Sequence, residues 1–173
     1  QGEQLSLGFY RNFKANTIET SLELYFKRLK HYLDYKSGAS LLLNHQLETD
    51  VIATRGKAYG AELLVRKTSG KLTGWLSYTF SRILLQSNDP DAGELINEGK
   101  FYPANFDKPH IVNLIGNYKF SHRYAVTLSI GYSTGRPITL PLAVFNLGGA
   151  QRVYYPDRNH FRTPDYFRAD FSM

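Results

Sequence analysis

"KLTGWLSYTF", residues 71–80, alternates between two kinds of side chain almost without a break. An extended strand sends successive side chains to opposite faces. One face of this stretch is therefore apolar and the other polar, with Leu72, Gly74, Leu76, Tyr78 and Phe80 on the first and Thr73, Trp75, Ser77 and Thr79 on the second. The pattern predicts a strand whose apolar face contacts either a protein core or lipid.

The same alternation recurs along most of the chain. It covers residues 4–13, 20–29, 58–68, 72–82, 110–120, 124–134 and 166–173. These runs predict an all-β protein with about seven strands of roughly nine to eleven residues. Strands of soluble proteins are commonly about five to six residues long, so the expected strands are unusually long.

The links between these runs are alternately short and long. Short links follow the runs that end near residues 13, 68 and 120, whereas residues 30–57, 83–109 and 135–164 form long links. In an antiparallel meander, all short turns then lie at one end of the sheet and all long loops at the other. This sorting is typical of outer-membrane barrels, which have short periplasmic turns and long external loops.

Aromatic and charged residues fit the same arrangement. Tyr and Phe account for 24 of the 173 residues, which favours aromatic belts at two membrane interfaces. One belt is predicted from Tyr59, Tyr78, Phe80 and Tyr132, and the other from Tyr118, Phe120 and Tyr124. Cations on the apolar faces fall near strand ends, where long side chains reach the interface, namely Arg11, Arg28 and Lys67. The apolar face is therefore expected to contact lipid and the polar face to line a lumen.

Composition narrows the function classes. The sequence has no Cys, so it forms neither a disulfide nor a thiolate metal site. No apolar run approaches the ~18 residues that a membrane-spanning helix requires. The net charge of +6 raises nucleic acid as a partner, but the basic residues are scattered and carry no nucleic-acid motif. The scattered charge also fits a surface that lies against anionic lipid head groups.

Two features predict that the chain is a segment of a larger wall. About seven strands is an odd number, whereas bacterial single-chain barrels close with an even number. Met173 also lies within an alternating run and is followed by no turn signal.

Ligand-binding candidates come from the long links. Aromatic rings and arginines are common in partly polar binding sites, and those singled out here are Tyr102, Arg136, Arg152, Tyr154, Tyr155 and Phe161. Structural roles compete in each case: a rigid loop-to-strand junction for Tyr102, a salt bridge at the rim for Arg136, and a self-packed external loop for the residues of 152–166.

The sequence contains no nucleophile–base arrangement, no phosphate-binding glycine loop and no His spacing suited to a metal, so no enzyme activity and no cofactor are predicted. "NDPDAGE" (88–94) departs from the calcium-loop pattern and is expected to be a solvated acidic loop. "SGASLLLNHQL" (37–47) is interpreted either as a small strand in an external loop or as a segment packed over the barrel mouth.

Several stretches resemble TonB-dependent receptors of Bacteroidetes. They are "SLELYFKRLKHYLDYKSGAS" (21–40), "AYGAELLVRKTSGKLTGWLSYTFSR" (58–82), "INEGKFYPANFDKPHIVNLIGNYKFS" (96–121), "YSTGRPITLP" (132–141) and "RNHFRTPDYFRADFSM" (158–173). The resemblance covers most of the chain, follows the family's order and corresponds to the later part of the barrel domain.

The resemblance implies a barrel of about 22 strands in the outer membrane of a Gram-negative bacterium. It implies nutrient import driven through TonB, with a plug domain and terminal strands that lie outside residues 1–173. It also implies a small nutrient ligand of unidentified class and a surface lipoprotein as a possible partner. Two other classes remain open: a small complete outer-membrane barrel acting as an adhesin or envelope protein, and a soluble lipocalin-like barrel with its apolar face inward.

Overall fold

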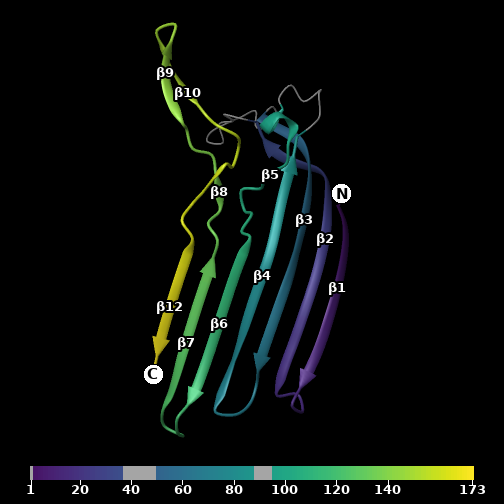
Figure 1. Ribbon diagram of the computed structural model, residues 1–173, viewed down its shortest axis with the longest axis vertical. Helices are drawn as coiled ribbons and strands as arrows, with labels where there is room; N and C mark the ends of the chain where they lie inside the picture. Colours follow the sequence, from purple (N-terminus) through teal and green to yellow (C-terminus); the bar gives the residue numbers. More distant parts are fainter. Residues whose placement is uncertain (1, 37–49, 88–94) are drawn as a thin grey trace.

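The protein folds into one long antiparallel sheet. The computed structural model describes residues 2–36, 50–87 and 95–173. Seven strands follow one another across the sheet in chain order (Figure 1), each antiparallel to its neighbour. They are β1 (Gly2–Phe13), β2 (Ile18–Tyr35), β3 (Val51–Lys67), β4 (Leu72–Gln86), β6 (His110–Lys119), β7 (Ala125–Ser133) and β12 (Tyr166–Ser172). An eighth strand, β5 (Tyr102–Pro103), pairs with the end of β4.

The prediction of an all-β antiparallel meander is confirmed. The short links after β1, β3 and β6 lie at one end of the sheet, and the long links lie at the other (Figure 1). The sheet is open, because β1 and β12 pair with only one strand each among the described residues.

Four further elements belong to the last long link and one to the link after β4. Strand β8 (Pro137–Ile138) pairs with β11 (Phe161–Arg162), and β9 (Ala143–Leu147) forms a hairpin with β10 (Ala150–Tyr154). This hairpin projects beyond the end of the sheet (Figure 1). The link after β4 contains a short 3₁₀ element, η3 (Ile96–Gly99). The segments 37–47 and 88–94, interpreted above from sequence, lie outside the described residues.

The first four strands are longer than the alternation predicts. The expected strand at 20–29 extends to Tyr35, and its partner begins at Val51 rather than at residue 58. A β-bulge shifts the register between Leu29 and Tyr32, and His31 within it has φ of 55°. A bulge inserts one extra residue and so resets the alternation of faces. The pairing continues beyond it although the period-two pattern stops.

Register aligns the apolar positions of all seven strands. One row crosses the whole sheet and consists of Phe9, Leu22, Leu63, Tyr78, Val112, Tyr132 and Phe167. The row with opposite side-chain direction consists of Tyr10, Ser21, Leu64, Ser77, Asn113, Gly131 and Arg168. The sheet therefore has one apolar and one mainly polar face, as the alternation predicts.

No second layer covers the apolar face within the described residues. The extensive contacts of each strand are with its neighbours in the sheet. Exposed apolar side chains accordingly lie along β1, β2 and β12, where Phe9 is 57% and Phe167 66% exposed. The buried hydrophobic cluster lies instead at the long-loop end and consists of Ile52, Leu85, Ile96, Tyr102 and Ala104, with Tyr32 and Ile83 packed against it.

Two glycines face each other in the register of β4 and β6, and only one of them is sterically required. A Cβ atom on Gly74 would lie 2.1 Å from the carbonyl oxygen of Ile115, whereas a Cβ on Gly116 would have no neighbour within 4 Å. The close approach of the two backbones therefore depends on Gly74.

We predict that Gly74→Ala lowers the free energy of unfolding by about 1–3 kcal/mol, because the added methyl group has to displace backbone. The matched control Gly116→Ala changes it by no more than about 0.5 kcal/mol. Urea unfolding of both variants, followed through the fluorescence of the adjacent Trp75, measures the difference. Equal losses would contradict this account of Gly74.

Candidate ligand-binding rim

The long-loop end of the sheet is fastened by two carboxylates that sit among arginines. Asp107 is fully buried and lies in the link between β5 and β6. Its Oδ1 accepts hydrogen bonds from the backbone N–H of Ile83 at 2.7 Å and from Nε of Arg82 at 3.3 Å, and its Oδ2 accepts one from Nη2 of Arg162 at 2.5 Å. Two guanidinium groups and a backbone N–H thus provide the counter-charges and hydrogen bonds that a buried carboxylate requires.

Arg162 extends this connection to the last long link. Its Nη1 donates to the backbone carbonyl oxygens of Asp107 at 2.8 Å and of Gly135 at 2.9 Å. Gly135 is itself closely packed, since a Cβ there would lie 1.7 Å from the carbonyl oxygen of Thr163. The guanidinium group of Arg162 thus connects the segment before β6, at Asp107, with the start of the link that follows β7, at Gly135.

The second carboxylate, Asp34, lies near the end of β2. Its Oδ2 accepts hydrogen bonds from the hydroxyl of Tyr102 at 2.7 Å and from Nη1 of Arg158 at 3.1 Å. Burial, and next the hydrogen bond to Asp34, raise the pKa of Tyr102 above its ordinary value of 10.0. The phenol therefore remains a hydrogen-bond donor at neutral pH.

Side-chain amides complete the fastening of the loops. Asn97 in η3 donates from Nδ2 to the carbonyl oxygen of Arg158 at 3.1 Å and accepts from the N–H of Arg158 at 2.7 Å. Asn159 is buried, and its Nδ2 donates to the carbonyl oxygen of Pro103 and to Oδ1 of Asn105. Segments more than 50 residues apart in the chain are thereby held together.

A hollow of about 490 Å³ lies beside this network. It is lined by Leu95, Ile96, Asn97 and Glu98 from the link after β4 and by Thr139 and residues 154–158 from the link after β7. Tyr154 and Tyr155 are 56% and 55% exposed, so their rings are free to contact a ligand. The lining combines aromatic faces with amide, carboxylate and guanidinium groups, which is a common composition for binding polar organic molecules.

The structure separates the six residues that the sequence singled out. Tyr154 and Tyr155 both line the hollow. Tyr102 is only 1% exposed and holds Asp34, so its ring is part of the buried cluster rather than the surface of the hollow.

The other three candidates lie around the same links but not in the lining. Arg152 is exposed on β10, opposite Phe145 of the hairpin. Arg136 is exposed, and its backbone carbonyl accepts a hydrogen bond from the N–H of Thr163; its side chain forms no ion pair in the part of the chain that the structure describes. Phe161 lies on β11 with its ring 5.1 Å from that of His160. Ligand binding by all six residues stays a prediction.

Sequence reasoning missed the polar residues that organise the rim. Asp34 lies in β2 beyond the last alternating residue, and the others lie outside the seven strands of the meander, namely Asn97, Asp107, Arg158 and Arg162. No local pattern in the sequence reveals how they pair. The high density of Tyr, Arg and Asp in 152–166 was the available signal, because two of the fastening arginines lie within it.

Comparison of the chain with protein-family models, with curated proteins and with solved structures gave no match. Across residues 2–36, 50–87 and 95–173, no three His, Asp or Glu side chains gather as a potential metal site. The described part of the chain also contains no helix with the length and hydrophobicity needed to span a membrane.

We predict that Asp107→Ala loosens the rim by about 3 kcal/mol, because Arg82 and Arg162 lose their partner and the N–H of Ile83 loses its acceptor. Amide hydrogen exchange should accelerate in residues 135–138 and 161–163 while β4 and β6 stay protected at their centres. The control is Asp170→Ala, whose partner Arg168 is 65% exposed, and which should leave exchange at the rim unchanged. Exchange that does not change in Asp107→Ala would contradict the fastening role of this carboxylate.

Proposed function

We propose that this sheet is part of the wall of a closed transmembrane β-barrel in the bacterial outer membrane. The observation that carries the proposal is the seven-residue apolar row, which crosses every strand and is covered by no second layer among the described residues. A soluble protein would bury such a face against a core. Hydrocarbon is the other solvent in which an extended apolar face is stable.

The ends of the strands support the same proposal. Where β6 begins, the hydroxyl of Tyr78 in the neighbouring strand lies 2.9 Å from Nδ1 of His110, and the Phe80 ring packs against the same imidazole. At the short-turn end, Tyr118 and Phe120 pack edge to face with centroids 4.7 Å apart. Rings with one apolar and one polar side are favoured at both interfaces of a membrane.

Two cations on the apolar face reach toward the short turns, which supports the proposal. The guanidinium of Arg11 lies 4.9 Å from the ring centroid of Phe13, which is nearer the short turn, and Nζ of Lys67 donates to the carbonyl oxygens of Ser69 and Leu72. Arg28 differs, because its guanidinium lies 5.8 Å from the ring centroid of Phe26, on the short-turn side of Arg28. A charged group at the bilayer midplane would cost about 2–4 kcal/mol, and long side chains avoid this cost by reaching toward an interface.

The transport class of this proposal is nutrient import by a TonB-dependent receptor. It rests on the resemblance of the quoted motifs together with the polar face and the fastened rim. On this proposal the hollow beside Tyr154 and Tyr155 captures the nutrient from outside, and the polar face lines its route. Coupling to TonB through a plug is implied by the resemblance alone.

A protein partner at the rim is part of the proposal. The β9–β10 hairpin projects beyond the sheet and exposes Leu142, Val144, Phe145, Leu147 and Val153. Exposed apolar patches of this kind mark interaction sites. A surface lipoprotein that covers the barrel mouth fits this location.

The single tryptophan of the sequence provides the test of membrane placement, because Trp75 lies on the polar face. In vesicles that contain brominated lipids, Trp75 should be quenched weakly by lipid and readily by aqueous iodide or acrylamide. The double variant Trp75→Phe, Leu76→Trp moves the indole to the apolar face and should reverse both results. Strong lipid quenching of Trp75, or none at position 76, would refute the proposed orientation.

For the transport class, we predict that a deletion strain fails to grow on one nutrient of a panel of glycans, peptides, siderophores and vitamins. The double variant Tyr154→Ala, Tyr155→Ala should raise the concentration of that nutrient needed for half-maximal uptake about tenfold, because a binding surface loses two aromatic contacts. Tyr124→Ala, at the opposite end of the sheet, serves as the control and should leave uptake unchanged. Normal growth of the deletion strain on the whole panel would count against import.

A further inference from the structure

The net positive charge of this chain is concentrated at one end of the sheet. The short-turn end comprises residues 10–20, 63–76, 114–128 and 168–173, all of which the structure describes. These segments hold eight Lys or Arg residues and two carboxylates, a difference of six that equals the net charge of all 173 residues. The rest of the chain therefore has equal numbers of basic and acidic residues and no net charge.

The two carboxylates at this end are already paired. Glu19 lies 3.8 Å from Arg66, and Asp170 accepts two hydrogen bonds from Arg168. The other cations, together with one histidine, are here called the basic belt: Arg11, Lys14, Lys67, Lys71, Lys119, His122 and Arg123. No member of the belt forms an ion pair with a carboxylate within the described ranges.

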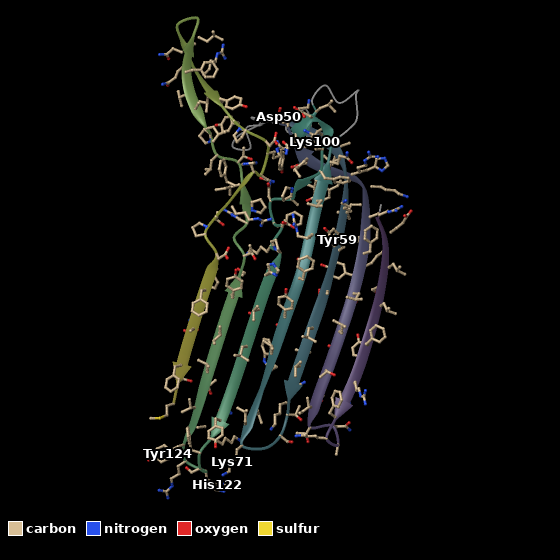
Figure 2. The ribbon with its side chains drawn as sticks, viewed as in Figure 1. Asp50, Tyr59, Lys71, Lys100, His122 and Tyr124 are labelled. Atoms are coloured by element: carbon tan, nitrogen blue, oxygen red, sulfur yellow. The ribbon has the colours of Figure 1, made fainter. Side chains whose placement is uncertain are left out.

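Part of the basic belt surrounds a hollow of about 530 Å³. It is lined by Lys71, Lys119, His122 and Arg123, with Phe120 and Tyr124 beside them. Lys71, His122 and Tyr124 lie together at the end of the sheet opposite Lys100 and Asp50 (Figure 2). No carboxylate from the part of the chain that the structure describes lines this hollow, so its charge is suited to an anion.

The belt adjoins the apolar face directly. Arg11 and Lys67 occupy positions on that face, and the Phe120 and Tyr124 rings next to the hollow are each 62% exposed. The turn between β6 and β7 is held by its own hydrogen bonds, in which Oγ of Ser121 accepts from the N–H groups of Arg123 and Tyr124. From the turn toward the middle of the sheet, the surface thus changes from cations to aromatic rings and then to apolar side chains.

We propose that the basic belt binds the phosphate groups of anionic phospholipids in the leaflet beside the short turns. A soluble anion requires only the cations, whereas a phospholipid also uses the aromatic and apolar surface that continues from them. Basic groups near a membrane surface attract anionic headgroups additively. This inference rests on the proposed membrane placement of the apolar face.

The test is the lipid composition that the protein retains. The full protein is reconstituted in nanodiscs with equal phosphatidylglycerol and phosphatidylcholine, and native mass spectrometry counts the lipids that remain bound. Wild type should retain phosphatidylglycerol preferentially. The triple variant Lys71→Gln, Lys119→Gln, Arg123→Gln should lower this preference about a hundredfold, since each of the three cations contributes roughly fivefold.

The matched control removes three cations at the other end, in Lys57→Gln, Lys100→Gln, Lys108→Gln, and should retain the preference. No preference in wild type, or equal loss in both triple variants, would overturn the proposal. Displacement of phosphatidylglycerol by excess inorganic phosphate would also overturn it, because the belt would then be a site for soluble anions.

Two further variants keep the test decisive if the triple variant does not insert. Arg123→Gln alone should lose about fivefold in the same assay, and Arg123→Lys, which keeps the charge, should lose little. The brominated-lipid experiment on Trp75 and position 76 does not depend on headgroup charge. Correct quenching with no headgroup preference would therefore reject the belt while leaving the proposed membrane orientation intact.

Discussion

An apolar row seven strands wide, with no second layer against it among the described residues, is the constraint on which the rest of this structure depends. Apolar surface in water costs about 25 cal/mol per Å², so a face of this extent requires a partner. Within the described ranges, β1 and β12 each use one side only for pairing. In hydrocarbon every backbone N–H and C=O needs an internal acceptor or donor. The proposed barrel would satisfy both requirements together, through closure of the sheet and contact of its outer face with lipid.

The two ends of the sheet differ in their links and in their charge. At the long-loop end, buried Asp107 and partly buried Asp34 hold three arginines and thereby fix loops from distant parts of the chain around a hollow. A site built on such fastened loops keeps its shape without its ligand, which lowers the entropic cost of binding. At the short-turn end the links are minimal and carry the excess positive charge. On the proposals made here, one end selects the nutrient and the other anchors the wall in the membrane.

The strands could be predicted from the sequence far better than the contacts at the long-loop end. Alternation in "KLTGWLSYTF" and its counterparts predicts the seven strands and their two faces, because side chains alternate with a period of two. The alternately short and long links predict that neighbouring strands run antiparallel in chain order. The alternation in β2 stops at residue 29, because the bulge at His31 reverses which side chains point to each face of the sheet. The ion pairs of Asp34 and Asp107 escaped prediction because their partners lie 124 and 55 residues away, in links with no period. Tyr154 and Tyr155 line the hollow and belong to the segment rich in Tyr, Arg and Asp. Tyr102 is equally aromatic, but it lies in β5 and is buried where β5 pairs with β4.

The most direct measurement of the central claim is an accessibility profile along β4 in lipid bilayers. Nitroxide labels placed singly at residues 75–80 would report contact with oxygen, which concentrates in hydrocarbon, and with a polar nickel chelate, which stays in water. We predict that oxygen contact is high at 76, 78 and 80, that nickel contact is high at 75, 77 and 79, and that the two profiles are in opposite phase with a period of two residues. Nickel contact at position 76 equal to that at 77, or low contact with both reagents at 76, 78 and 80, would contradict the account.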